Sequence, residues 1–136
     1  IPASEALACV YGYAVGLDLT RRDLQQRAKE KGHPWDMGKG FDQSAPIGAI
    51  VPLAVAGHPV CGSIWLRVNG RLRQSGDLGQ MSWKVAEVIA NLSTYVALAP
   101  GDLIFTGTPA GVSTVLRGDV LEAGVAGVGE LRVRLV

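Results

Sequence analysis

The stretch SIWLRVNGRLRQSG, residues Ser63 to Gly76, constrains the fold more than any other part of the chain. Its apolar residues occupy every second position from Ile64 to Val68, which is the period of a strand with one buried face. Asn69-Gly70 then supplies the two residues that tolerate positive φ in a type I′ turn. The sequence therefore predicts an antiparallel β-hairpin here.

The composition agrees with a fold built from short strands. The chain has 136 residues, enough for one domain with a real core, and it contains 18 glycines and 7 prolines among 48% hydrophobic residues. This mixture favours short elements joined by tight turns. Apolar, β-prone segments predict further strands, and these lie at residues 9–20, 103–107, 119–125 and 130–136. No internal repeat or linker divides the sequence.

Three helices are also predicted. Residues 2–10 fit a short helix whose first turn contains a proline. Thr20 is a suitable N-cap for a second helix, which should run to about Lys31 and end at Gly32. A third helix is expected from about Trp83 to Val96, where valine, isoleucine and leucine recur at helical spacing. With the strands, these helices predict an α+β domain.

Charge and cysteine content exclude several classes of function. Thirteen basic residues against twelve acidic ones give a net charge of +1, so neither nucleic acid nor an anionic membrane is an expected partner. No apolar run approaches the ~18 residues that span a bilayer. Cys9 and Cys61 are isolated from each other and from histidine spacings, which favours reduced thiols over a disulfide or zinc site. We expect a soluble, cytoplasmic protein.

Charged and amide side chains crowd into residues 15–41. Asp18 ends an apolar strand, where a buried carboxylate needs a cation or hydrogen-bond donors. It fits either an ion pair with Arg21 or Arg22 or the role of metal ligand, and one carboxylate alone does not decide between them. Arg22 and Gln25 share one helix face, which either is solvated or borders a small polar cavity.

Two further residues suit the binding of an anion. Lys39 lies between two glycines beside Phe41, so it is either a surface lysine or a cation that stabilises an oxyanion or enolate. Thr108 follows a predicted strand among glycines, and its hydroxyl and the nearby amides suit a carboxylate. His33 and His58 stand alone in loops and are interpreted as structural or surface residues.

With these residues in this order, the chain resembles the fumarylacetoacetate hydrolase family over nearly its whole length. Four segments carry the resemblance: GYAVGLDLTRRDLQ, KGHPWDMGKGFDQSAPIG, LRVNGRLRQSGDLGQM and LAPGDLIFTGTPAGV. They are similar to the C-terminal catalytic domain of that family, and the first two look most like its acylpyruvase and fumarylpyruvate hydrolase branch.

The resemblance implies a fold, an activity and a set of site residues. The fold is a mixed, strand-rich β-roll with two or three short helices, commonly in a homodimer. The activity is hydrolysis of the carbon–carbon bond of a 3-acylpyruvate, with Mg²⁺ or Mn²⁺ as cofactor. Asp18 matches a metal ligand, Gln25 and Lys39 match catalytic and substrate-binding residues, and Arg22 and Thr108 match substrate contacts.

One departure from the family pattern affects the expected boundaries. The family has a Glu-x-Glu motif and a water-activating His/Glu pair upstream of its aspartate, and neither occurs before Asp18. Residues 1–136 are therefore expected to form a single domain that is the C-terminal part of the catalytic domain. A decarboxylase, tautomerase or hydratase acting on a 2-oxo acid, or a non-catalytic binding or dimerisation fragment, remain alternative functions.

Overall fold

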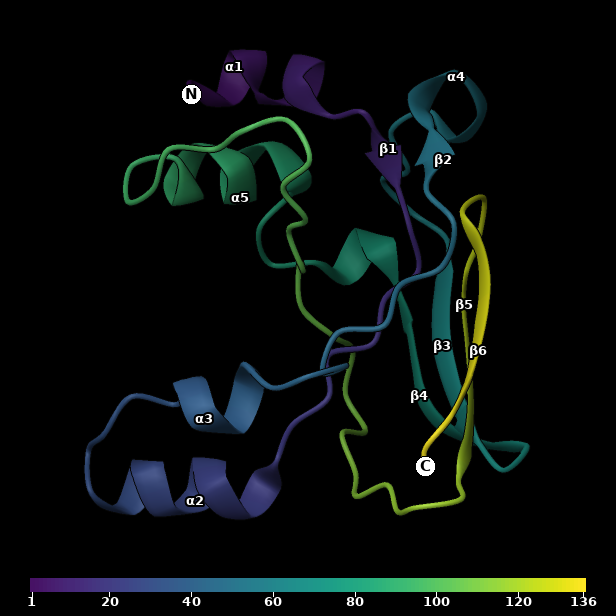
Figure 1. Ribbon diagram of the computed structural model, residues 1–136. Coiled ribbons are helices and arrows are strands. Elements are labelled where there is room, and N and C mark those ends of the chain that lie inside the picture. Colours follow the sequence, from purple (N-terminus) through teal and green to yellow (C-terminus); the bar gives the residue numbers. More distant parts are fainter.

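A four-stranded antiparallel sheet forms one side of the molecule in the computed structural model, which describes residues 1–136 (Figure 1). Its strand order is β4-β3-β5-β6, and a separate small sheet pairs β1 with β2. The strands are β1 (Gly12–Tyr13), β2 (Val51–Pro52), β3 (Ser63–Val68), β4 (Arg71–Asp77), β5 (Val120–Val125) and β6 (Gly129–Arg134). The two strands predicted in the tail are confirmed as β5 and β6.

The predicted hairpin is confirmed as β3 and β4. Asn69 and Gly70 have φ values of 50° and 76°, as a type I′ turn requires. The pairing register shifts inside the hairpin, because Gln74 pairs with Leu66 whereas Leu72 pairs with Arg67. This bulge leaves Arg73 without an opposite residue, and it changes which side of the sheet the following residues face.

Two longer helices and three one-turn helices accompany the sheets. They are α1 (Ala3–Ala6), α2 (Arg22–Glu30), α3 (Asp36–Lys39), α4 (Leu53–Ala56) and α5 (Val85–Leu92), with 3₁₀ turns η1 (Leu7–Cys9) and η2 (Leu78–Gln80). The predicted α+β class is confirmed, and all three predicted helices are present, although α5 is shorter than the expected 83–96. None of the helices is long and apolar enough to span a membrane.

The predicted N-cap of the second helix is wrong. Arg21 occupies the N-cap position of α2, and no side chain there accepts a hydrogen bond from the first turn. The Thr20 hydroxyl accepts a hydrogen bond from Lys39 instead. A tertiary partner has thus replaced the local capping interaction that residue type and position favoured.

Two predicted strands are largely extended chain without a ladder. Within residues 9–20 only Gly12–Tyr13 form a strand, and sporadic hydrogen bonds hold the remainder, such as Leu17 N–H to the Pro46 carbonyl at 2.9 Å. Residues 103–107 form no strand and make no backbone-to-backbone hydrogen bond. A β-prone sequence becomes a strand only where a partner strand is in reach, and the loop containing residues 103–107 has none.

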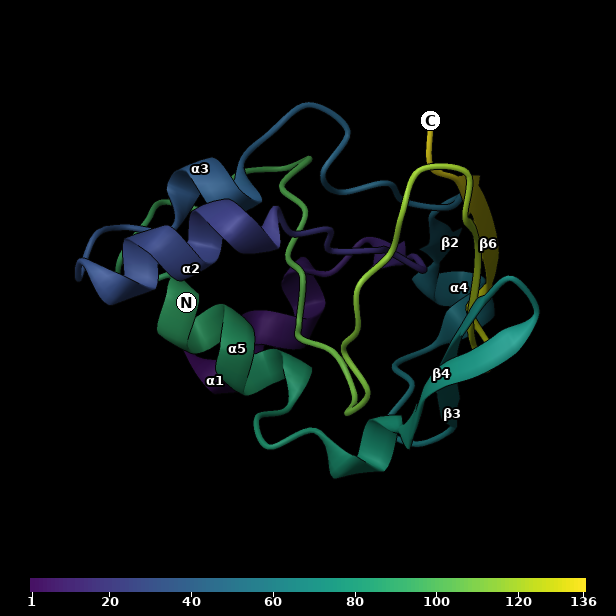
Figure 2. The same ribbon diagram turned by 90° about the horizontal axis from the view of Figure 1, so that it is seen from below.

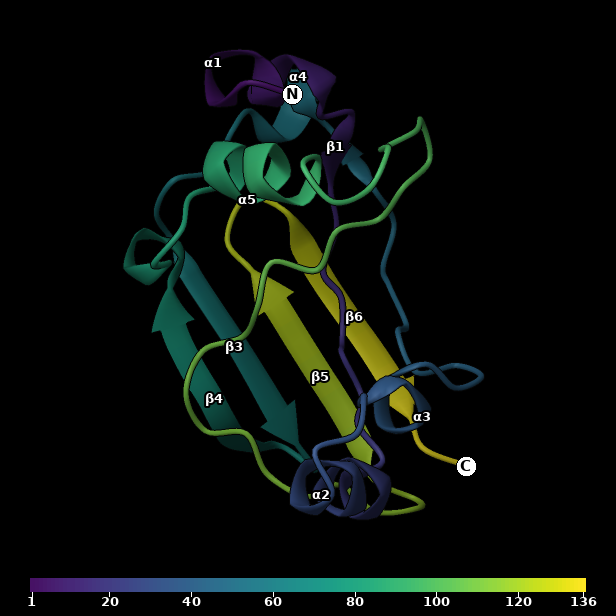
Figure 3. The ribbon, with the colours of Figure 1, turned by 90° about the vertical axis from the view of Figure 1, so that its left-hand side faces the viewer.

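Four of the helices lie on one side of the four-stranded sheet in two separate pairs, whereas α4 packs against the small sheet of β1 and β2. α1 packs with α5, α2 packs with α3, and the loop of residues 98–118 runs between the two pairs across the face of the sheet (Figure 3). The view from below also shows these two pairs on one side and the four-stranded sheet on the other (Figure 2). The loop of residues 98–118 therefore crosses the part of the sheet face that lies between the two helix pairs.

The hydrophobic core is small and lies against the inner face of the sheet. Only 11 of the 136 residues are buried. Six of them form the core cluster, namely Val15, Leu17, Val68, Leu121, Ala123 and Val128. The core thus fixes the extended segment before α2 against β3 and β5, which determines where the residues after Leu17 lie.

Candidate functional site

An ion pair between Asp18 and Lys39 is the centre of the candidate site. The Lys39 ammonium lies 2.5 Å from the Asp18 carboxylate and donates to the Thr20 hydroxyl at 2.9 Å. Side-chain exposures are 33% for Lys39 and 53% for Asp18, so both groups remain open to an incoming molecule. Asp18 pairs with neither of the adjacent arginines that the sequence suggested.

Backbone alternation explains the direction of the Asp18 side chain. Val15 and Leu17 are buried in the core, whereas Gly16 and Asp18 between and after them are exposed. This is the two-residue period of an extended chain. Burial of the two apolar side chains therefore directs the carboxylate away from the core without burying it.

The contact between α2 and α3 positions Lys39 from the other side. Gly38 is buried, and a Cβ atom there would lie only 3.0 Å from the backbone nitrogen of Gln25. The Arg21 N–H donates to the Gly38 carbonyl at 2.9 Å, and the Arg21 guanidinium lies 4.5 Å from the centre of the Phe41 ring. Glycine at position 38 thus permits the close helix contact that brings Lys39 to Asp18.

Arg22 and Gln25 contact each other rather than the ion pair. The Arg22 guanidinium donates to the Gln25 side-chain oxygen at 2.7 Å, with Arg22 exposed and Gln25 half-buried. Both residues are on α2, close to α3, as the shared helix face predicted. No hydrogen bond or ion pair joins them to Asp18 or Lys39.

Thr108 lies in the long loop, and its partner is a residue that the sequence did not single out. The Gln74 side-chain nitrogen donates to the Thr108 hydroxyl at 2.7 Å and to the Pro109 carbonyl at 2.7 Å. Gln74 is only 9% exposed. The Gln74 side chain points inward because of the bulge at Arg73. No sequence pattern in this strand predicts that bulge.

A large apolar cavity separates the two groups of polar residues. Its volume is about 810 Å³, and 26 of its 38 lining residues are hydrophobic. Leu17, Gln74 and Thr108 line it, whereas Asp18, Arg22, Gln25 and Lys39 do not. The structure therefore places Thr108 on the cavity wall and the ion pair one residue beyond that wall.

Tyr13 is another polar residue on this cavity. Its hydroxyl lies 2.8 Å from Nδ1 of His58, and burial raises the pKa of Tyr13 above its usual value. His58 thus has a polar partner, in keeping with the structural role expected for it.

The donor set for a divalent metal is incomplete in this chain. No three histidine, cysteine or acidic side chains gather as a metal site would require, and the Asp18 carboxylate is paired with an ammonium group. Mg²⁺ and Mn²⁺ prefer several oxygen ligands. The residues present therefore fit one ligand of such a site and not a whole one.

Comparison with known proteins gives a decisive match. The C-terminal domain profile of fumarylacetoacetate hydrolase matches residues 1–136. The chain belongs to the fumarylacetoacetate hydrolase family. The family and branch that the four segments predicted are confirmed.

Relatives of this family, both solved structures and curated sequences, match this chain over nearly its whole length. A fumarylpyruvate hydrolase from Pseudomonas aeruginosa, solved with Mn²⁺ and pyruvate, is 52% identical with a TM-score of 0.97, and it is matched over 100% of this chain and 58% of its own. A fumarylpyruvate hydrolase from Ralstonia sp. is 47% identical over 96% of this chain and 68% of its own length. A mitochondrial oxaloacetate tautomerase from Mus musculus is 42% identical over 99% of this chain and 61% of its own.

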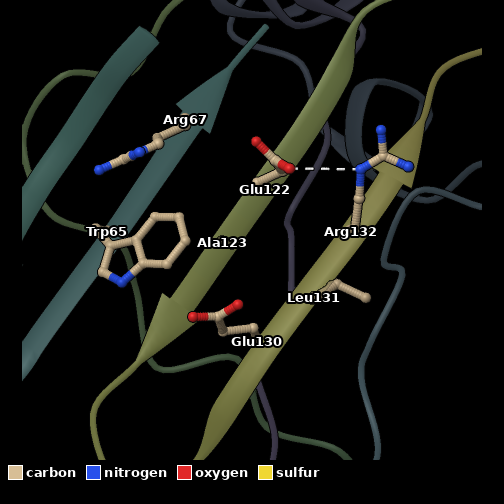
Figure 4. Close-up of a pocket in the computed structure, with 7 residues that line it drawn as sticks. All are labelled: Trp65, Arg67, Glu122, Ala123, Glu130, Leu131 and Arg132. Atoms are coloured by element: carbon tan, nitrogen blue, oxygen red, sulfur yellow. Dashed lines mark ion pairs between the residues drawn. The ribbon is translucent and has the colours of Figure 1, made fainter. Parts of the chain in front are cut away.

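A second hollow, on the outer face of the sheet, lacks every residue of the family site. It measures about 460 Å³ and is lined by Trp65, Arg67, Glu122, Ala123, Glu130, Leu131 and Arg132 (Figure 4). Arg132 and Glu122 lie 3.4 Å apart, and the Arg67 guanidinium lies 5.5 Å from the centre of the Trp65 ring. Its cations and anions balance one another, which fits the solvated face of an antiparallel sheet.

Proposed function

We propose that this chain is part of an enzyme that hydrolyses the carbon–carbon bond of a 3-acylpyruvate such as fumarylpyruvate, releasing pyruvate and a carboxylic acid. The observation that carries the proposal is the partly exposed Lys39, held by Asp18 and Thr20, with Leu17 beside Asp18 lining a large cavity. The 52% identity with a fumarylpyruvate hydrolase supports the same assignment.

In this proposal each polar residue meets a particular part of the substrate. When water attacks the carbonyl distal to the pyruvoyl group, an oxyanion develops, and Lys39 supplies the fixed positive charge beside it. Arg22 occupies the oxygen of the Gln25 amide, so the amide nitrogen of Gln25 is left to donate to the same intermediate. Thr108 binds the carboxylate of the pyruvoyl group, at the other end of the substrate from the attacked carbonyl.

A divalent ion, Mg²⁺ or Mn²⁺, belongs to the proposal, with Asp18 as one of its ligands. Such an ion would act as a Lewis acid toward the pyruvoyl oxygens. The remaining ligands and the group that activates water would come from polypeptide outside residues 1–136. When the ion is bound to Asp18, the Lys39 ammonium group, which forms an ion pair with Asp18 in this structure, would turn toward the substrate.

A tautomerase is the second candidate function, because the Mus musculus relative, at 42% identity, has that activity in its name. The two reactions differ in their products. Hydrolysis of fumarylpyruvate gives pyruvate and a second acid in equal amounts, whereas tautomerisation of oxaloacetate only interconverts its keto and enol forms. Proton NMR of both reaction mixtures decides between them, and the same spectra reveal decarboxylation or hydration.

We also propose that further polypeptide of the family domain covers the apolar cavity. The accessible surface of the chain is 9154 Å², whereas a folded monomer of 14.3 kDa should expose about 6,800 Å². The excess of roughly 2,300 Å² is the area that one partner buries in a large obligate interface. The match covers 68% and 58% of the length of two relatives, so the unmatched part of each supplies an occupant of suitable size.

Complementation in trans tests the domain proposal and provides the activity assay. The 136-residue chain is mixed with the part of the Ralstonia sp. relative that it does not match, in the presence of Mn²⁺. We expect a one-to-one complex by sedimentation velocity and hydrolysis of fumarylpyruvate only in the mixture. Phe105, which lines the cavity and is 39% exposed, provides the test variant Phe105→Asp, which should prevent the complex.

The matched control is Leu72→Asp, since Leu72 is 58% exposed and does not line the cavity. It should leave the complex intact. A chain that is active alone, or a complex that tolerates Phe105→Asp, would contradict the domain proposal. The homodimer that the resemblance implies and the cytoplasmic location expected from the composition remain proposals, and the sedimentation coefficients also report whether two copies associate.

A further inference from the structure

The two hydrogen bonds of the Gln74 side chain determine whether the Thr108 hydroxyl donates or accepts. The Pro109 carbonyl oxygen only accepts hydrogen bonds, so the Gln74 side-chain atom 2.7 Å from it must be the amide nitrogen. The same nitrogen lies 2.7 Å from the Thr108 hydroxyl oxygen. Because an N–H group can only donate, Thr108 accepts this hydrogen bond, and its own hydroxyl hydrogen remains for another acceptor.

The backbone around Thr108 holds the loop against β4 at this point. Gly111 has a φ of 103°, and a Cβ atom there would lie 2.1 Å from the Arg73 carbonyl oxygen. A Cβ atom at Gly76 would lie 2.9 Å from Pro109. Two close approaches and two hydrogen bonds thus fix a loop segment that has no strand partner, with Thr108 and Gln74 both on the cavity wall.

We propose that Gln74 is a positioning residue for ligand binding, which turns Thr108 into a directed hydroxyl donor for the carboxylate of a 2-oxo acid. The inference rests on the proposed function and deepens it. A threonine without such a partner can rotate its hydroxyl to donate to the Pro109 carbonyl or to accept from solvent. With Gln74 in place, one acceptor site of the hydroxyl oxygen and one of the Pro109 carbonyl are taken, which favours donation of the hydroxyl hydrogen into the cavity.

The test compares a carboxylate with its neutral ester. Pyruvate and methyl pyruvate are titrated into the isotope-labelled 136-residue chain in the presence of Mg²⁺, and the two dissociation constants come from NMR shifts. We expect the wild-type chain to prefer pyruvate. Gln74→Met keeps the side-chain length and removes both donors, so the preference should fall about tenfold, with the affinity for methyl pyruvate nearly unchanged.

Two further variants show whether Gln74 acts through Thr108. Thr108→Val should reduce the preference by a similar factor, and adding Gln74→Met to it should have no further effect. Gln26→Met on the exposed face of α2 is the matched control and should change neither constant. If Gln74→Met unfolds the chain, Gln74→Glu serves instead, because a carboxylate forces Thr108 to donate to it.

The outcomes separate this inference from the proposed function. A wild-type chain that does not prefer pyruvate refutes carboxylate recognition by Thr108, and the role of Gln74 falls with it. A wild-type preference that survives Gln74→Met refutes the positioning role alone. Equal weakening of pyruvate and methyl pyruvate assigns Gln74 a purely structural role and also overturns the inference.

Discussion

Replacing Lys39 with methionine should separate the contribution of this residue to stability from its contribution to catalysis. The Lys39–Asp18 pair is 33% and 53% exposed, so water screens it and the interaction is worth about 0.2–1 kcal/mol. The hydrogen bond to Thr20 is partly buried and contributes a similarly modest amount. Lys39→Met should therefore lower the free energy of unfolding by about 1 kcal/mol, or the melting temperature by about 4 °C.

The expected effect on turnover is much larger. Loss of one donor to a developing oxyanion typically reduces the rate by a hundredfold or more, which corresponds to ~3 kcal/mol in the transition state. Urea unfolding of the 136-residue chain measures the first quantity, and fumarylpyruvate hydrolysis by the complemented protein measures the second. Lys31→Met removes an equal charge just after α2 and should affect neither.

Two results would refute this reasoning. Turnover by Lys39→Met within threefold of wild type would remove the lysine from the mechanism. A loss of more than about 3 kcal/mol in unfolding free energy would mean that the pair behaves as a buried one, in contradiction to its exposure in the structure.

Three other substitutions test the fold around the site. Leu121→Ala truncates the largest fully buried side chain, 1% exposed, and should cost about 2–5 kcal/mol in urea unfolding; a loss below 1 kcal/mol would contradict the assigned core. Hydrogen bonds from the Leu116 N–H and then from Asn69 hold the pKa of Asp119 below its usual value. This carboxylate therefore stabilises the fold above its unfolded pKa, and the gain is lost as pH falls through the lowered folded pKa. Asp119→Asn should make the urea midpoint depend less on pH between about pH 5 and pH 3, and an unchanged pH dependence would refute this. Gly111→Ala should destabilise the chain and lower its preference for pyruvate over methyl pyruvate, since φ at this position is 103° and the new Cβ would meet the Arg73 carbonyl.

Local patterns predicted the elements whose partners are close in sequence. Asn69-Gly70 determines its own turn, and the hairpin and tail strands pair with near neighbours. Residues 103–107 have the same β-prone composition and form no ladder. Tertiary structure brings no partner strand to these residues, and this outweighs their strand propensity.

The candidate site shows the same division. The sequence and the family resemblance together identify Asp18, Lys39 and Thr108 as candidate site residues. They do not predict which residues these three side chains contact. Thr20 was expected to cap α2, and its hydroxyl instead accepts from Lys39. Gln74 reaches Thr108 only because of a bulge one residue earlier. Contacts between residues that are far apart in the sequence produce no periodic pattern in it, so the patterns of a single sequence do not predict them.

Gly16 connects the two halves of the site. It lies two residues before Asp18, and a Cβ atom on it would come within 2.7 Å of the Phe105 ring, in the loop that carries Thr108. The segment that holds the metal-ligand candidate therefore touches the segment that holds the carboxylate contact, at the wall of the apolar cavity. Polypeptide that fills this cavity must pack against both. We therefore expect assembly of the whole domain and binding of the substrate to be energetically coupled.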